Sequence, residues 1–157
     1  MLELIQHAQR VSDLLVEKKQ TVAVAESAAG GLISAALLAV PGASRYYIGG
    51  TVIYTARAWN AFHDVKDLLG TARSSTEANA LARGRIARER FGATWGIGET
   101  GAAGPDGNRY GDPAGHAWVA VSGPAEKALL VRTADNDRVR NMHAFAAAAL
   151  SLLADSL

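Results

Sequence analysis

The spacing of hydrophobic residues predicts alternating helices and strands in the first third of the chain. Near the N-terminus, apolar residues recur every three or four positions between polar ones, which predicts an amphipathic helix over residues 2–18. The alternating, β-branched segment 21–25 predicts a strand. After a tight turn, the apolar segment 32–40 predicts a helix that Pro41-Gly42 ends. A second strand is expected over residues 47–54.

The middle of the chain predicts another helix followed by a strand. Residues 56–69 have a mixed pattern, typical of helix interrupted by loops. Ser74 and Glu77 have the spacing of a capping box, which predicts a helix that starts there and ends at Gly92. Residues 93–98 then predict a short strand that leads into a glycine-rich loop.

The C-terminal third predicts two more strands and a buried helix. Segments 115–122 and 128–132 are rich in β-forming residues and flank a Gly-Pro turn, as in a hairpin. An alanine-rich helix is expected from Asp135 onward. Helices that alternate with strands, followed by a strand pair, indicate an α/β fold with a mixed sheet.

Composition narrows the class of protein. The 157 residues show no linker or shift in composition, so we expect a single domain over residues 1–157. Sixteen Lys and Arg against fifteen Asp and Glu give a net charge of +1, which predicts neither nucleic acid nor a membrane as partner. The lack of cysteine excludes disulfides, a thiol nucleophile and thiolate metal sites. No apolar stretch approaches the roughly 20 residues that span a bilayer, and no signal peptide is apparent, so we expect a cytoplasmic protein.

Two strand-to-loop junctions are candidates for a functional site: ESAAGG at residues 26–31 and ETGAAGPDG at residues 99–107. Ligands of open α/β sheets bind at the carboxyl ends of strands, and a helix that starts there favours a phosphate or an oxyanion. Ser27 is compatible with three roles: the N-cap of the next helix, a nucleophile, or a hydroxyl donor to a ligand. The glycines of the second junction are also compatible with turns alone.

Other candidate chemistry is weak. Neither glycine-rich loop matches a dinucleotide or nucleoside-triphosphate fingerprint. The four histidines have no ligand spacing, so we expect no metal. The arginines of segment 83–90 are expected on a solvated helix face rather than in a nucleic-acid patch.

Several motifs occur in order from about Val22 to the C-terminal helix: ESAAGG, the strand GGTVIY, the loop TGAAGPDG and the late strand DPAGHAWVAV. Together they resemble the CinA C-terminal-domain family, the nicotinamide mononucleotide deamidases. The family patterns are ESCTGG, Gly-x-x-x-Tyr followed by Ser-Asn-Glu-Ala-Lys, a helix-opening Ser, TGIAGPDGG and PVGTV. They are matched here at Glu26, Ser27, Gly30, Gly31, Gly50, Tyr54, Ser74, Thr100, Gly101, residues 103–107, Pro113 and Gly115. The resemblance implies a three-layer α/β/α sandwich with a mixed, mostly parallel sheet, and a homodimer.

The resemblance also implies an activity: hydrolysis of the carboxamide of nicotinamide mononucleotide to nicotinate mononucleotide and ammonia, without metal or cofactor. The catalytic residues that it implies are Ser27, Tyr54 and Thr100. The ligand-binding positions that it implies are Gly30, Gly31, Trp59, Gly101, Ala102, Ala103, Gly104 and Arg140.

The sequence departs from the family where proton transfer is expected. Trp59 stands where the family has Lys, Ala28-Ala29 replaces Cys-Thr, and Ala134-Asp135-Asn136 replaces Gly-Asp-Arg. A serine needs a base, and loss of a general base costs about 10²–10⁴ in rate. We therefore expect weak or no amidase activity, with Trp59 in the pocket, stacked on a ligand ring. Glu26 and Glu99 are alternative bases.

Two other functions are compatible with the sequence. The chain is either a non-catalytic protein that binds a nucleotide or another phosphorylated ligand, or a structural module whose glycines only make turns. If the two glycine-rich loops form one site, Ser27 and Thr100 must lie close together.

Overall fold

The structure is a computed structural model that describes residues 1–59, 61 and 72–157; the side chain of Trp59 lies outside the described part. At its centre is a five-stranded sheet in the order β2-β1-β3-β4-β5. The strands are β1 (Val22–Glu26), β2 (Tyr47–Val52), β3 (Trp95–Ala102), β4 (His116–Ser122) and β5 (Glu126–Arg132). Strand β1 pairs in parallel with β2 and β3, whereas β4 is antiparallel to β3 and β5. Four strands therefore run in one direction and β4 opposes them.

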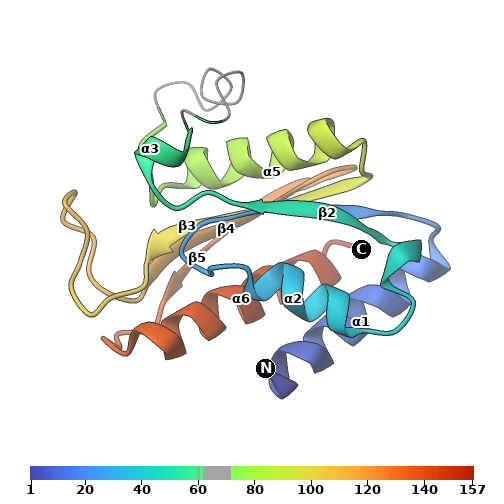
Figure 1. Ribbon diagram of the computed structural model, residues 1–157, viewed down its shortest axis with the longest axis horizontal. Helices are drawn as coiled ribbons and strands as arrows, with labels where there is room; N and C mark the ends of the chain where they lie inside the picture. Colours follow the sequence, from blue (N-terminus) through green and yellow to red (C-terminus); the bar gives the residue numbers. More distant parts are fainter. Residues whose placement is uncertain (60, 62–71) are drawn as a thin grey trace.

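Helices cover both faces of this sheet (Figure 1). One face carries α1 (Leu2–Glu17), α2 (Leu32–Ala39) and α6 (Arg138–Ala154), and the other carries α5 (Glu77–Phe91). A 3₁₀ turn, η1 (Ala43–Arg45), precedes β2, and the short α3 (Ala56–Trp59) follows it. The expected three-layer α/β/α sandwich with a mixed sheet is confirmed. None of the described helices is long and apolar enough to cross a membrane.

The main core lies between the sheet and the layer of α1, α2 and α6. The hydrophobic stripe of α1 is buried there, as its periodicity predicts, through Leu4, Ala8, Val11 and Leu15. Strands β1, β3 and β4 supply β-branched side chains to the same cluster, and α6 adds Phe145, Leu150 and several alanines.

On the opposite face, α5 packs with its backbone directly against β3. A Cβ atom on Gly96 would clash with the carbonyl oxygen of Gly84, and one on Gly98 would clash with that of Ala80. Glycine at these two strand positions is therefore required by the close approach of the helix.

Several element boundaries differ from the prediction. Strand β3 continues to Ala102, so residues expected at the start of a loop belong to the strand. Helix α5 begins after Thr76, whose hydroxyl accepts from the Asn79 amide at 3.3 Å, and Ser74 is not its cap. Ser75, with φ of 60°, turns the chain between the two. Helix α6 begins after Asp137, which accepts from the Arg140 amide at 3.0 Å.

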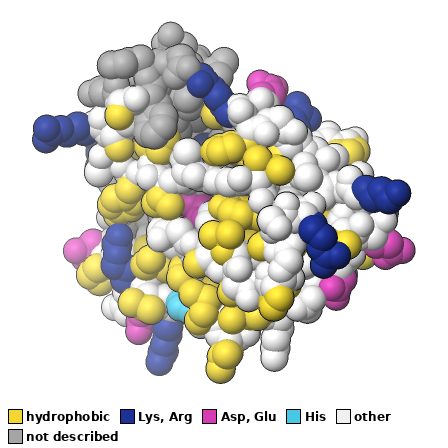
Figure 2. All heavy atoms as spheres, turned by 45° about the vertical axis from the view of Figure 1, so that its right-hand side comes forward, with side chains coloured by type: hydrophobic (Ala, Val, Ile, Leu, Met, Phe, Trp, Pro, Cys, Tyr) yellow, Lys and Arg dark blue, Asp and Glu magenta, His cyan; other side chains and the backbone are white. Residues whose placement is uncertain are grey.

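Charged side chains are dispersed over the surface. In Figure 2, hydrophobic side chains gather near the centre of the face in view, and Lys and Arg stand apart from one another around them. The most exposed large hydrophobic side chains of the described part are Leu2, at 83%, and Val139, at 62%.

Candidate functional site

Glu26, the last residue of β1, caps helix α2 with a buried carboxylate. Its Oε2 accepts from the amides of Gly31 and Ile33 at 2.9 and 3.0 Å. Its Oε1 accepts from the Ser34 amide at 2.8 Å and the Ser34 hydroxyl at 2.6 Å. An anion at this end is stabilised by the helix dipole. The protein's own carboxylate therefore occupies the position where the sequence predicts a phosphate or an oxyanion.

The N-cap role considered for Ser27 is wrong, because Gly31 occupies that position. Ser27 instead contacts the second glycine-rich segment through its backbone. Glu99 of β3 places Oε2 2.8 Å from the Ser27 amide and 2.9 Å from the Ala29 amide, and accepts from both. Within the described part of the chain, the Ser27 hydroxyl makes no hydrogen bond. The two motifs thus meet through the Glu99 side chain.

The carboxyl of Glu99 is completely buried, and only one of its two oxygens accepts hydrogen bonds from the described residues. Its Oε1 has no hydrogen-bond partner among the described residues. Burial raises the pKa of Glu99 to about 7; the Ala29 and Ser27 amides and the Arg83 charge oppose that rise, and the Glu26 charge adds to it. A carboxyl with this pKa exchanges its proton near neutral pH.

Arg83 is the buried cation beside these carboxyls, so its expected place on a solvated face is wrong. It is 2% exposed and donates from Nε to Asn79 Oδ1 at 2.8 Å. It also donates to the carbonyl oxygens of Glu26 and Ile53, both at 3.4 Å. Burial lowers the pKa of Arg83 to about 10, against the effect of the Glu99 charge. The buried charges of the two carboxyls are thereby partly compensated.

Thr100 is buried and contacts the segment before α5. Its Oγ1 accepts from the Ser75 amide at 3.0 Å. Successive side chains of a strand point to opposite faces, so Thr100 turns away from the Ser27 loop that Glu99 contacts. No hydrogen bond joins the Ser27 and Thr100 side chains in the described part.

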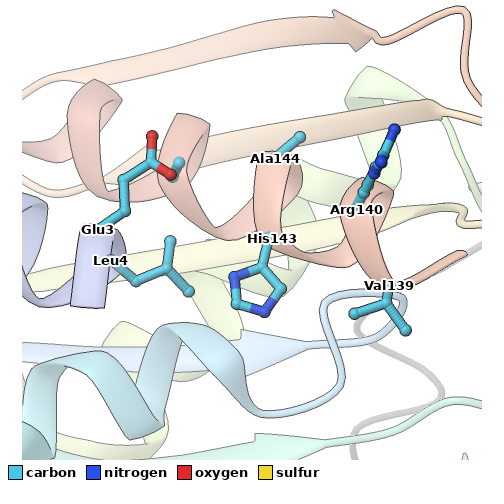
Figure 3. Close-up of a pocket in the computed structure, with 7 residues that line it drawn as sticks. Glu3, Leu4, Val139, Arg140, His143 and Ala144 are labelled. Atoms are coloured by element: carbon cyan, nitrogen blue, oxygen red, sulfur yellow. The ribbon is translucent and has the colours of Figure 1, made fainter. Parts of the chain in front are cut away.

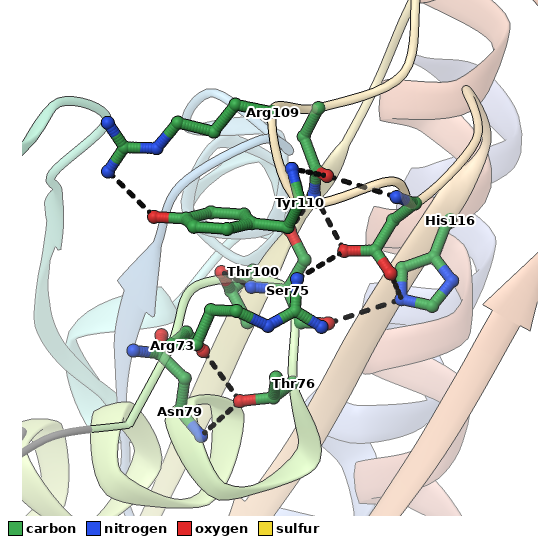
Figure 4. A network of polar contacts seen from close by, with 10 residues as sticks. Arg73, Ser75, Thr76, Asn79, Thr100, Arg109, Tyr110 and His116 are labelled. Atoms are coloured by element: carbon green, nitrogen blue, oxygen red, sulfur yellow. Dashed lines mark hydrogen bonds and ion pairs between the residues drawn. The ribbon is translucent and has the colours of Figure 1, made fainter.

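A polar network around Ser75 fixes the loop that follows β3 (Figure 4). The Ser75 hydroxyl accepts from Asn108 Nδ2 at 3.2 Å, and its carbonyl oxygen is 3.2 Å from His116 Nε2. Asp112 accepts from Asn108 Nδ2 at 2.8 Å and from Arg73 at 2.9 Å. Burial would raise the pKa of Asp112, but these hydrogen bonds lower it overall. The network stabilises the wall of an adjoining pocket.

That pocket, of about 300 Å³, is formed by Tyr54, residues 101–108 and Arg138. One Arg138 amino group donates to the Gly104 carbonyl oxygen at 2.6 Å, and the other donates to the Tyr54 hydroxyl at 2.9 Å. Arg138 is the single cationic residue in this lining. The structure thus brings together five predicted site residues: Tyr54, Gly101, Ala102, Ala103 and Gly104.

Arg140 lies elsewhere. It is within 3.7 Å of Asp135 and 3.6 Å of Asp137, and it lines a separate hollow of about 340 Å³ with Glu3, His143 and their neighbours (Figure 3). Residues two positions apart on an α-helix are rotated by about 200° around its axis, so Arg138 and Arg140 face different sides of α6. Sequence reasoning missed Arg138, because the motif match indicated only the later arginine.

Gly30 and Gly31 shape the turn before α2. Their φ angles of 69° and 95° favour glycine, and a Cβ on Gly30 would lie 2.7 Å from Met142 Cε. The Gly30 amide donates to the Ser27 carbonyl oxygen and the Gly31 amide to Glu26. Both amides are therefore engaged within the protein.

Two predictions remain: the position of the Trp59 side chain and the lack of a metal site. Trp59 ends the backbone of α3, but its side chain lies outside the described residues. In residues 1–59, 61 and 72–157, no group of three or more His, Asp or Glu side chains is placed to hold a metal ion.

Comparison with known proteins places this chain in a family. Residues 4–157 match the CinA C-terminal domain family. A CinA-like protein from Acidobacterium capsulatum is 43% identical over 136 residues, which cover 85% of this chain and 32% of that protein. One from Myxococcus xanthus is 41% identical over 140 residues, with 85% and 33% covered. The chain thus spans about a third of the length of these relatives.

Solved structures agree with that assignment. A competence-damaged protein (CinA) superfamily protein from Escherichia coli has a TM-score of 0.88 at 26% identity, covering 98% of this chain and 90% of that one. A superfamily member from Klebsiella pneumoniae, at 24% identity, has the same fold, with a TM-score of 0.88 and coverage of 98% and 96%. The motifs, the fold and the sequence match agree, and the chain belongs to the CinA C-terminal domain family.

Proposed function

We propose that this protein binds nicotinamide mononucleotide or a close analogue and hydrolyses its carboxamide slowly, with Ser27 as the nucleophile. The observation that carries the proposal is the pair of hydrogen bonds from the Ser27 and Ala29 amides to Glu99. These bonds support a single site that contains the free serine hydroxyl just after β1 and the glycine-rich segment of β3. The family resemblance supplies the substrate class.

The pocket formed by Tyr54, residues 101–108 and Arg138 supports binding of the rest of a nucleotide. Two bonds of Arg138 hold its guanidinium against Tyr54 and the Gly104 carbonyl oxygen. A guanidinium has five N–H donors in a fixed fork, so other donors are left for a phosphate. Residues 101–108 line the same pocket. We assign the phosphate to Arg138 and the carboxamide to Ser27.

Slow turnover is expected because two aids to catalysis are missing. Trp59 replaces the family's lysine. The amides of Gly31, Ile33 and Ser34, which would favour an oxyanion, bind Glu26. An oxyanion hole typically lowers the barrier by several kcal/mol, so its occupation by Glu26 reduces the rate strongly.

The same occupation of backbone donors favours a second candidate, a protein that binds the nucleotide without hydrolysing it. In this case Tyr54 and Arg138 would hold the ligand and Ser27 would contribute only a hydroxyl contact. The homodimer expected from the resemblance stays a prediction.

Ammonia release and calorimetry test these functions together. Purified protein is incubated with nicotinamide mononucleotide, and Ser27→Ala serves as the control. Serine-dependent ammonia release supports the amidase, and binding without release supports the second candidate. If neither is measured at millimolar ligand, both are rejected.

A further inference from the structure

Glu99 carries the one buried, unpartnered side-chain oxygen or nitrogen atom in the described part of the chain. Buried polar atoms nearly always have a partner, and an exception requires an explanation. Glu26, the neighbouring buried carboxylate, shows what a purely structural role looks like: both of its oxygens accept two hydrogen bonds. In Glu99, Oε2 accepts both hydrogen bonds, and Oε1 accepts none in the described part of the chain.

The free oxygen belongs to the carboxyl nearest to the Ser27 backbone. Glu99 Oε2 is 2.8 Å from the Ser27 nitrogen, and the Ser27 hydroxyl makes no hydrogen bond in the described part. The Ser27 hydroxyl can rotate about χ1, and this rotation changes its distance from the Glu99 carboxyl. Ser27 is 8% exposed and Glu99 is fully buried, so the serine is the more accessible of the two.

The charges around Glu99 allow it to take up and release a proton. Arg83 on α5 stabilises its anion, Glu26 on β1 destabilises it, and burial outweighs both. The resulting pKa of about 7 suits a general base near neutral pH. Arg83, with a pKa of about 10, keeps its own proton at that pH.

We propose that Glu99 is the general base that activates Ser27, in place of the family's lysine, whose position Trp59 occupies here. Glu99 Oε1 accepts the hydroxyl proton as Ser27 Oγ forms a bond to the acyl carbon. The carboxyl then gives this proton to the leaving nitrogen as the C–N bond breaks, so that ammonia departs and an ester remains on Ser27. A water molecule attacks the ester, its proton passes through Glu99 to Ser27 Oγ, and the carboxylic acid product is released. The choice of substrate, though not of base, rests on the proposed function.

Neither Glu26 nor Thr100 fits this role. Both Glu26 oxygens are saturated by backbone and hydroxyl donors of α2. Thr100 is bonded to Ser75 and has no basic group.

The experiment uses a fluorophosphonate, which labels an activated serine whatever its natural substrate. Ser27 Oγ forms a bond to phosphorus, fluoride leaves and the base takes the proton. Labelling at Ser27 is located by mass spectrometry and its rate is measured from pH 5 to 9. Glu99→Gln keeps an acceptor for the two amides but removes the base. The matched control is Glu89→Gln, the same change at an exposed carboxylate beside Arg88.

Wild-type labelling is expected to rise with pH around a midpoint near 7, and Glu99→Gln to lower it by about 10²–10⁴. The control should label at the wild-type rate, and Ser27→Ala should not label. No labelling of wild-type Ser27, or a rate independent of pH, overturns the base even if the Gln variant fails to fold. A folded Gln variant that labels normally overturns it as well.

Parallel ammonia assays separate the two proposals. Base-dependent labelling without hydrolysis of nicotinamide mononucleotide supports the base and rejects the substrate. Hydrolysis that Glu99→Gln leaves unchanged does the reverse.

Discussion

Arg138 donates a hydrogen bond to the Tyr54 hydroxyl at 2.9 Å, although 84 positions separate the two residues in the sequence. The guanidinium also lies 5.7 Å from the centre of the Tyr54 ring. This pair connects the start of α6 with the segment after β2 and, through the Gly104 carbonyl oxygen, with the loop after β3. Three distant parts of the chain thereby form one pocket wall.

Arg138→Gln is expected to weaken binding of nicotinamide mononucleotide about 10- to 100-fold, because hydrogen bonds to a charged group contribute roughly 1.5–3 kcal/mol. Arg140→Gln is the matched control and should change affinity less than about twofold, since its exposed ion pairs contribute little. Calorimetry measures both. Nicotinamide riboside, which lacks the phosphate, should not distinguish the variants; a larger effect of Arg140→Gln would reassign the phosphate.

The pKa of Glu99 predicts a pH dependence of stability. Its value is raised from 4.5 to about 7 by folding, so the folded protein holds this proton more tightly than the unfolded chain does. The contribution of Glu99 is fully present below pH 4.5 and is lost as the pH rises to about 7. The difference in unfolding free energy between wild type and Glu99→Gln, measured with urea, should fall across this window and be constant above it. A difference that does not vary between pH 4.5 and 8 would contradict the raised pKa.

Gly96→Ala is expected to destabilise the fold by about 1–3 kcal/mol or more, because its new methyl group meets the α5 backbone at Gly84. Gly84→Ala is the control at the same contact. A Cβ there lies 3.1 Å from the Gly96 carbonyl oxygen, and alanine favours a helix by roughly 0.5–1 kcal/mol, so the change should be small. Denaturant unfolding compares the two, and equal effects would argue against close backbone packing.

Trp59→Lys is expected to increase ammonia release, because a desolvated lysine can act as a base for serine. The family resemblance also suggests Ala29→Thr, but Ala29 is fully buried in the core, and the larger side chain would disturb its packing. The single variant is therefore the better test. Efficient turnover by wild type, not improved by Trp59→Lys, would show that this position does not limit the reaction.

The sequence predicts the fold well because hydrophobic periodicity reflects burial directly. The stripe of Leu4, Val11 and Leu15 is buried as expected, and the five strands occur in the predicted order along the chain. Boundaries are less accurate where side chains outside the periodic pattern decide them. Thr76 rather than Ser74 caps α5, because the left-handed turn at Ser75 places the helix start two residues later.

The candidate site is only half visible in the sequence. Motif matches identify Ser27, Tyr54 and residues 101–104, but they do not say which donors are already occupied. In the sequence, Glu26 and Glu99 look alike, because each is a glutamate that precedes a glycine-rich loop. The fold gives hydrogen-bond donors to both oxygens of Glu26 but leaves Glu99 Oε1 without a partner in the described part of the chain. Likewise, the orientation of α6 about its axis determines that Arg138, and not Arg140, lines the pocket with Gly104.

The capping of α2 by Glu26 also has a consequence for ligand binding. Four hydrogen bonds from Gly31, Ile33 and Ser34 hold the turn in one shape before any ligand arrives. The entropy lost in ordering this segment is therefore part of folding and does not reduce affinity. The turn is therefore a preorganised surface, and the ligand that we propose would not have to rearrange it on binding.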